Sequence, residues 1–221
     1  MIFKKIIYII ISSILIFAAC QPDVKEQAPE PIPPPPAGAI FPEADTWVSS
    51  WGTEIGTNHG THPIMHIRTI NPAATAYYYS VARFNLRNRT IDGNSKGKLY
   101  LTATANWSGG IPTVYAFPIN NNAWGETSLT YTSSIQTGSA DRIPEVSSFN
   151  TATGVGSIGR VVLTETPVEG TRIIIPLDSL PPVSHNNKIS FVIASSANFH
   201  LNHVGSRENP TREFRPYLVI E

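Results

Sequence analysis

The sequence has little of what several common protein classes require. Only one of its 221 residues is a cysteine, which excludes an intramolecular disulfide framework and a zinc site built from several thiolates. Charged residues make up 14% of the chain, against roughly 25% in soluble domains, and sixteen basic side chains balance sixteen acidic ones. A chain without net positive charge lacks the basic face that phosphates require, so we expect no nucleic-acid partner. No segment after residue 40 has helical periodicity, which excludes a helical bundle.

The only long apolar run is at the N-terminus and reads as a secretion signal. Lys4 and Lys5 precede apolar residues 6–17, a stretch shorter than the ~20 residues of a membrane span. Small residues then lead to Cys20, and this pattern resembles a bacterial lipobox, in which the cysteine is lipidated after cleavage. An ordinary signal peptide is the alternative. Gln21 after the cysteine resembles the sorting pattern of outer-membrane lipoproteins, so residues 1–19 are predicted to be removed and Cys20 to carry the lipid anchor.

Residues 20–40 are predicted to form a linker. They contain few apolar side chains, so ordering them would cost conformational entropy without burying a core. The run Pro33–Pro36 favours an extended polyproline helix, which would hold a domain away from the lipid surface. A proline motif that binds a partner is the alternative reading.

Residues 41–221 are predicted to form one all-β domain. Short runs of β-branched and aromatic residues alternate with glycine, proline and asparagine clusters. Within Lys98–Asn106, alternate residues such as Leu99 and Leu101 share one face, the pattern of a half-buried sheet. Nine such runs favour an antiparallel jelly-roll β-sandwich. The polar segment Thr132–Ser157 is predicted to be a long loop across one end of it. The predicted strands are Thr46–Ser50, Ile64–Arg68, Tyr77–Asn85, Lys98–Asn106, Thr113–Ile119, Arg160–Thr164, Arg172–Leu177, Lys188–Ser195 and Tyr217–Ile220.

Five motifs occur along this domain in a recognisable order. They are Ala-Asp-Thr-Trp-Val at 44–48, Arg-Phe-Asn at 83–85, Trp-Gly-Glu-Thr-Ser-Leu-Thr-Tyr at 124–131, Ser-Arg-Glu at 206–208 and Pro-Tyr-Leu-Val-Ile at 216–220. This order resembles the DNRLRE-type domain, which is grouped with carbohydrate-binding module family 96. Asn85 stands where that family usually has Asp, and Tyr131 where it often has Trp. The resemblance covers about residues 41–221 and implies a jelly-roll module that binds polysaccharides, alginate-like polymers among them.

The residues do not indicate an enzyme. Glycoside hydrolysis needs two carboxylates about 5–9.5 Å apart, and no acidic pattern marks such a pair. Glu126 and Glu208 lie in the motifs but have Trp or Arg neighbours and read as structural. A small polysaccharide lyase using histidine and the nearby Tyr77–Tyr79 is the catalytic alternative.

The sequence does not assign a metal site. His59, His62 and His66 are candidates for zinc, but His62 and His66 on one strand would be separated by about 13 Å, too far for one ion. A structural calcium ion is a second candidate cofactor, with Asp45 as a contributor, although no run of aspartates marks a binding loop.

Sugar binding requires exposed aromatic rings and planar hydrogen-bonding groups. Trp47 and Trp124 are expected in the core, whereas Trp51 and Trp107 lie beside glycines and are the candidate stacking residues.

Three cations on predicted strands, Arg68, Arg83 and Lys98, are candidates to line a sheet face that receives an anionic polymer. The alternative is that they are solvated or paired with acids. Arg207 beside Glu208 reads as a clamp on the last strand.

Taken together, these observations predict a non-catalytic polysaccharide-binding lipoprotein of the bacterial outer membrane, exposed at the cell surface. Its polymer would be alginate-like or another uronate-containing glycan, and its partners would be neighbouring glycan-degrading enzymes or transporters. An adhesive surface protein that binds other proteins is the alternative, and the sequence leaves the particular glycan open.

Overall fold

The computed structural model describes residues 31–69, 77–87, 89, 91–92, 94–108, 110–181, 183, 186–196 and 202–221. The chain divides into a unit Met1–Pro31 and a compact unit Ile32–Glu221, which contains all the strands that the structure describes. The predicted signal peptide, Cys20 and residues 21–30 lie outside the described residues. No helix among the described residues is long and apolar enough to cross a membrane.

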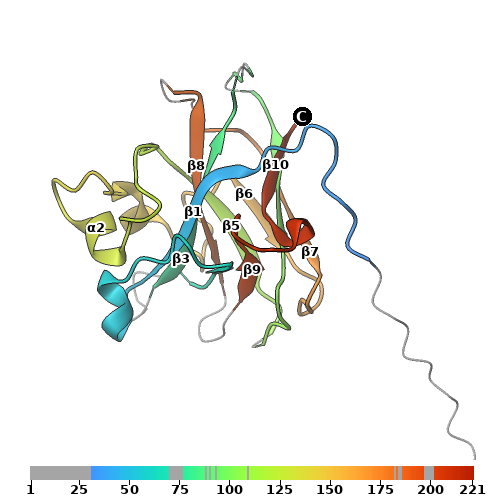
Figure 1. The fold of residues 1–221 in the computed structure, drawn as a ribbon, viewed down its shortest axis with the longest axis horizontal. Coiled ribbons are helices and arrows are strands. Elements are labelled where there is room, and N and C mark those ends of the chain that lie inside the picture. The colour runs from blue at the N-terminus through green and yellow to red at the C-terminus, as the bar shows by residue number, and fades with distance from the viewer. Residues whose placement is uncertain are drawn as a thin grey trace, which may run out of the picture. The chain divides into compact units, whose positions relative to one another are not determined.

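Strands dominate the described part of the chain, and all their pairings are antiparallel (Figure 1). Eight of them form a curled sheet in the order β1-β3-β8-β5-β6-β7-β4-β10, and β2 pairs with β9 in a second sheet. This arrangement confirms the predicted antiparallel β-sandwich. The strands are β1 (Pro42–Ser49), β2 (Ile64–His66), β3 (Tyr78–Asn85), β4 (Gly97–Thr102), β5 (Thr113–Ile119), β6 (Gly159–Val162), β7 (Arg172–Leu177), β8 (Lys188–Ser195), β9 (His203–Gly205) and β10 (Tyr217–Ile220).

The curled sheet forms two layers around one core. Side chains of β3, β5 and β8 pack against those of β4, β7 and β10, with Phe84, Leu101 and Phe191 among the buried residues. Ile40 and Leu218 exchange two backbone hydrogen bonds of 2.9 and 2.8 Å, which join the segment before β1 to β10. The start of β1 is therefore fixed on both sides, by β3 and by β10.

A second core covers the opposite face of the layer β1-β3-β8-β5. Trp124, Leu129 and Phe149, from the segment between β5 and β6, pack there against Tyr79 and Phe117. The prediction that Thr132–Ser157 crosses an end of the sandwich is therefore wrong, because Ile143, Val146 and Phe149 of this segment are buried on a sheet face. The segment contains α2 (Tyr131–Ile135), with a capping box formed by Thr130 and Ser133, and the short 3-10 helix η2 (Pro144–Ser148).

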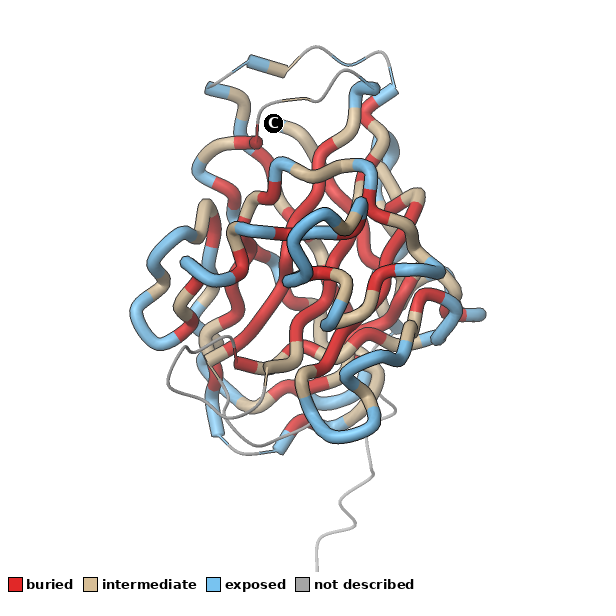
Figure 2. The backbone as a smooth tube through the Cα atoms, turned by 90° about the vertical axis from the view of Figure 1, so that its left-hand side faces the viewer, coloured by how far each residue is buried: buried red, intermediate tan, exposed pale blue. Residues whose placement is uncertain are grey.

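Because both of its faces are covered, β8 is buried along nearly its whole length. Figure 2 shows such buried stretches running through the middle of the molecule. The sequence of β8 accordingly contains the continuous apolar run Phe191–Ala194 in place of an alternation, as expected of a central strand.

All nine predicted strands are present, four of them with the predicted limits. Lys98–Asn106 is shorter than predicted, since β4 ends at Thr102. The three-residue β9 was not predicted, because so short a strand carries no periodicity. The remaining elements are 3-10 helices, η1 (Gly52–Gly56), which contacts α2, and η3 (Arg212–Phe214).

The part of the predicted linker that the structure describes contacts the sandwich. Pro33 accepts a hydrogen bond of 2.9 Å from Arg172 Nη2, and Gly38 accepts one of 2.9 Å from Arg89 Nη2. Together with the pairing of Ile40, these bonds hold residues 33–40 near the first and last strands.

Candidate functional site

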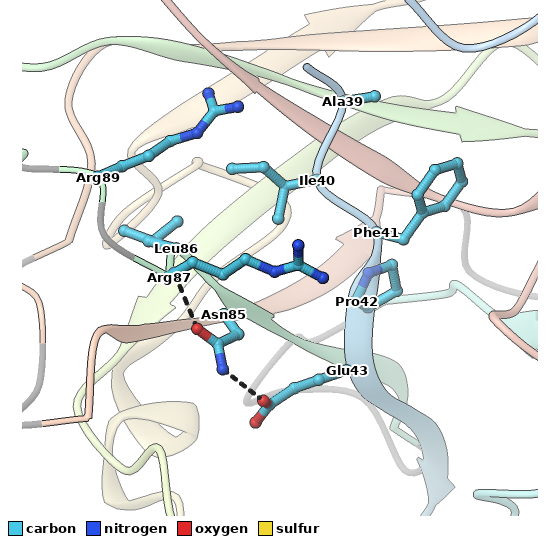
Figure 3. A pocket seen from close by; sticks show the side chains of 9 residues that line it. All are labelled: Ala39, Ile40, Phe41, Pro42, Glu43, Asn85, Leu86, Arg87 and Arg89. Atoms are coloured by element: carbon cyan, nitrogen blue, oxygen red, sulfur yellow. Dashed lines mark hydrogen bonds between the residues drawn. The ribbon is translucent and has the colours of Figure 1, made fainter. Parts of the chain in front are cut away.

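A pocket of about 570 Å³ opens where the start of β1 meets the end of β3 (Figure 3). One wall comes from the five residues 39–43, and the other from Asn85, Leu86, Arg87 and Arg89. Ile40 and Phe41 supply apolar surface, while the other wall supplies two guanidinium groups and a carboxamide. The pocket therefore combines the two kinds of surface that a sugar acid requires.

Among the described residues that line this pocket, Glu43 is the only acid, and cations of the sheet already engage it. Its Oε1 lies 2.6 Å from Arg83 Nε and 2.6 Å from Lys188 Nζ, and its Oε2 accepts a 3.2 Å hydrogen bond from Asn85 Nδ2. Partial burial raises the pKa of Glu43, but the hydrogen bonds and charges of Lys188 and Arg83 outweigh it and hold that pKa below its usual range. Glu43 is thus an ionised carboxylate whose charge is balanced by Arg83 and Lys188.

Arg87 stands in the turn that ends β3. Its φ of 55° is the left-handed region, and its N–H donates a 2.8 Å hydrogen bond to Asn85 Oδ1, which stabilises this turn. Figure 3 shows the side chain extending across the pocket toward Pro42. No hydrogen bond or ion pair within the described part of the chain engages its guanidinium. Arg87 therefore presents donors to whatever occupies the pocket.

The charges in and directly behind the pocket are mostly positive. Arg83, Arg87, Arg89 and Lys188 are four cations against the one carboxylate of Glu43, a formal charge of +3. Such an excess attracts an anionic ligand, and arginine in particular matches the planar geometry of a carboxylate.

A second charged cluster lies two residues further along β1. Asp45 is 1% exposed, and carboxylate oxygens of Asp45, Glu126 and Glu208 lie within 4.8 Å of one another. Arg207 joins them, with Nε 2.7 Å from Glu126 Oε1 and 2.6 Å from Glu208 Oε1. Burial raises the pKa of Asp45 well above its usual range, against the backbone hydrogen bond from Arg207. The structural roles predicted for Arg207, Glu126 and Glu208 agree with these contacts.

Trp47 is the centre of a third group. The ring of His59 stacks on it at 3.5 Å and that of His66 at 4.1 Å between centroids, while His203 lies 4.4 Å from His66. Burial, together with the charges of His203 and Arg68, lowers the pKa of His66 to about 3. These rings are neutral packing groups at physiological pH.

The model of carbohydrate-binding module family 96 matches residues 37–150, just over half of the chain. The chain belongs to carbohydrate-binding module family 96. No curated protein matches the sequence.

Membership of family 96 supports a carbohydrate-binding, non-catalytic role for the protein. The match contains both walls of the pocket, whereas Arg207, Glu208 and strands β6 to β10 lie beyond its end. The pocket therefore lies within the part of the chain that the family model matches.

The structure separates the two tryptophans that were predicted to stack on sugar. Trp51 is 58% exposed beside η1, as expected for a ring that meets a ligand, but it does not line the pocket. Trp107 is 5% exposed, and its Nε1 donates a 3.1 Å hydrogen bond to His203 O. The expectation that glycines keep Trp107 out of the core is wrong, because the segment after β4 folds back over the sandwich and buries the ring. Trp47 and Trp124 are buried, as predicted.

The three predicted cations do not share a sheet face. Arg83 on β3 pairs with Glu43 and lies 4.7 Å over the Trp124 ring. Arg68 lies 4.3 Å over the Tyr78 ring. Lys98, on the distant strand β4, pairs with Glu221. Each cation thus contacts the protein, Arg83 and Lys98 through acids and Arg68 through an aromatic ring.

The predicted histidine candidates for zinc do not form a ligand set. His59 and His66 stack on Trp47, and His59 Nε2 pairs with Glu54 Oε2 at 2.8 Å. His62 is exposed, and its Nδ1 lies 3.2 Å from Ile64 O. Within the described ranges, the only group of at least three residues at metal-binding distance is the acidic one.

Residues of the pocket itself were missed by the sequence analysis. Arg87 and Arg89 stand in a basic run directly after the Arg-Phe-Asn motif, and this run was the available signal. Phe41 gave none, since one aromatic residue before a strand is common.

Proposed function

We propose that the protein is a non-catalytic lipoprotein that binds an anionic, uronate-containing polysaccharide at the cell surface. The observation that carries the proposal is the Arg87 guanidinium, which extends across a pocket of about 570 Å³ and has no partner among the described side chains. In this arrangement Arg87 and Arg89 bind the carboxylate of one sugar, Asn85 contributes hydrogen-bonding capacity, and Phe41 contacts a ring face.

The pocket fits one or two sugar units, so the affinity of each site is weak. A shallow site buries little ligand surface. The affinity reflects only the interaction free energy that remains after the entropy lost on ordering the ligand and the side chains. Several lipid-anchored copies on one surface would raise the retention of a polymer through multivalency.

Anchoring would come from Cys20. The predicted linker, residues 20–40, would join the lipid to the sandwich. The pocket would then stay near the outer membrane while the polymer remains accessible to neighbouring glycan-degrading enzymes or transporters.

The experiment is retardation of residues 21–221 in gels that contain alginate, polygalacturonate, xylan or mannan. We expect retardation by the two uronate polymers only, and a loss of about tenfold in affinity for Arg87→Gln. Arg142→Gln is the matched control, because Arg142 is also exposed but lies outside the pocket. Equal retardation by the neutral polymers, or no effect of Arg87→Gln, contradicts the proposal.

Assays for reducing ends and for unsaturated sugar products run on the same samples. Product release would replace the binding role with that of a lyase. The residues to test would be His66 and His203, which lie beside Trp47, and Arg68, which lies over the Tyr78 ring.

A protein-binding, adhesive role is the second candidate. It is favoured by three exposed apolar side chains on and beside the adjoining elements η1 and α2, namely Trp51, Ile55 and Ile135 at 58%, 41% and 51%. If no polymer retards the protein, this patch becomes the site to test.

A further inference from the structure

Three carboxylates from distant parts of the chain meet at the buried side of β1. Asp45 comes from the strand itself, Glu126 from the turn after Trp124, and Glu208 from the turn after β9. One oxygen of each lies within 4.8 Å of the others, and Asp45 is 1% exposed. Carboxylates this close repel one another unless a positive charge lies between them.

The protein supplies too little positive charge for this cluster. Arg207 is the one cation paired with these acids in the described chain, so three carboxylates face one guanidinium, and the formal charge is −2 when all three are ionised. This is the opposite of the pocket two residues away, where cations are in excess.

Some carboxylate oxygens of this cluster also lack a hydrogen-bond donor. Asp45 Oδ2 accepts the Arg207 N–H at 2.7 Å, and Glu126 Oε1 accepts the Asp45 N–H at 2.9 Å. Asp45 Oδ1 and Glu208 Oε2 are buried and accept no hydrogen bond from any described residue. An unpartnered carboxylate oxygen on a side chain this deeply buried indicates a missing ligand, since buried polar atoms are nearly always satisfied.

We propose that Asp45, Glu126 and Glu208 bind one hard divalent cation, Ca²⁺ by its ligand preference. Carboxylate oxygens are the ligands that Ca²⁺ takes, and its flexible coordination accepts a mixed set of one- and two-oxygen contacts. Zn²⁺ prefers imidazole and thiolate, which none of the three residues provides, and Mg²⁺ demands a more regular octahedron.

Arg207 competes with the cation for the same oxygens. Its Nε contacts Glu126 and Glu208, while its Nη1 donates to Glu43 O at 2.5 Å. The contact with Glu43 O lets the guanidinium stay bound to the protein after the cation has displaced it from the carboxylates. The inference goes beyond polysaccharide binding and does not depend on it, because its experiments contain no sugar.

The test uses residues 21–221, freed of metal with EDTA, in calorimetric titrations and thermal unfolding. We expect one Ca²⁺ per chain and a rise of several degrees in Tm at 1 mM CaCl2, with a smaller rise for MgCl2. No binding heat and no change in Tm would overturn the proposal.

Two variants locate the site. Asp45→Asn and Glu208→Gln each remove one negative ligand while keeping the shape, and each is expected to weaken Ca²⁺ binding at least tenfold. Glu165→Gln is the matched control, an exposed acid outside the cluster. If Asp45→Asn does not fold, as judged by circular dichroism, Glu208→Gln decides. A wild-type response in the folded variants overturns the proposal.

Arg207→Gln separates a binding site from a purely structural ion network. Loss of the competitor is expected to raise the affinity for Ca²⁺ and to make the Tm more dependent on it. If Arg207 only holds the fold together, the variant loses stability and CaCl2 does not restore it, which contradicts the proposal.

Discussion

Glu43 and Asp45 are two carboxylates on the same strand, separated by the single residue Ala44, and they lie in opposite electrostatic environments. Glu43 lines an open pocket and meets Arg83 and Lys188. Asp45 is buried and meets two further carboxylates and a single Arg207. Residues i and i+2 of a regular strand point to the same face, but the register of β1 shifts between Pro42 and Ala44. This irregularity lets one strand contribute an acid to each of two regions.

The comparison shows how little residue type says about role. The pocket has an excess of positive charge and suits an anionic sugar, whereas the cluster at Asp45 has an excess of negative charge and suits a cation. Both regions contain one arginine that holds a carboxylate, Arg83 in the first and Arg207 in the second.

Removing these two arginines should give the largest effects. Arg83→Gln and Arg207→Gln are each expected to lower the free energy of unfolding by about 2–3 kcal/mol, since each leaves partly buried carboxylates less compensated. Arg83 also loses hydrogen bonds to Trp124 O and Asn122 O. Urea denaturation with and without CaCl2 tests the contrast: Ca²⁺ should restore only Arg207→Gln. Equal restoration of both variants would show that the two regions do not differ as described.

The next effect concerns Trp47, on the same face of β1 as Asp45. His66 beside it has a pKa of about 3 in the fold and an ordinary value of 6.5 when unfolded. Between these values the unfolded chain binds a proton that the folded chain does not, so stability is complete above pH 6.5 and falls as the pH decreases toward 3. We expect a loss of roughly 2–3 kcal/mol between pH 7 and pH 4, reduced in His66→Gln. Identical pH profiles from urea denaturation of the two proteins would contradict this.

Arg87 should affect binding and not stability. Arg87→Gln is expected to weaken uronate binding about tenfold and to change the free energy of unfolding by less than about 0.5 kcal/mol, because no hydrogen bond or ion pair with a described residue engages its guanidinium. Binding titrations and urea curves on one preparation measure both. A large loss of stability would mean that Arg87 supports the turn and not a ligand.

The smallest effect is the titration of Glu43. Its folded pKa lies below the ordinary 4.5, so its contribution is present above pH 4.5 and is lost as the pH falls through the folded value. We expect less than about 1 kcal/mol, since the ion pairs are partly exposed. The acid limb of the stability profile should be shallower in Glu43→Gln, and an unchanged limb would show that the pairs contribute nothing measurable.

Much of the fold could be predicted from local pattern. Alternation in Lys98–Asn106 identified β4 and its buried face, and the runs at β5, β7, β8 and β10 had the correct limits. The local sequence pattern failed where a residue is buried by segments that are distant in the sequence. Trp107 lies among glycines yet is buried, and the polar segment 132–157 covers a sheet face through a few apolar side chains.

The site was less predictable because its parts are distant in the sequence. Arg83 was identified from the sequence, but its partner Glu43 is 40 positions away, and Arg207 is 162 positions from Asp45. No local period encodes such pairs.

The sequence by itself determined the all-β architecture, the resemblance to family 96 and the expectation of a lipidated Cys20, since alternation, motif order and a short signal are all local. Only the tertiary structure decided which acid meets which base. Strand register and burial set those neighbours. In a medium of low polarity, the neighbours decide whether the charge of a carboxylate is balanced by the protein or left to be balanced by a bound cation.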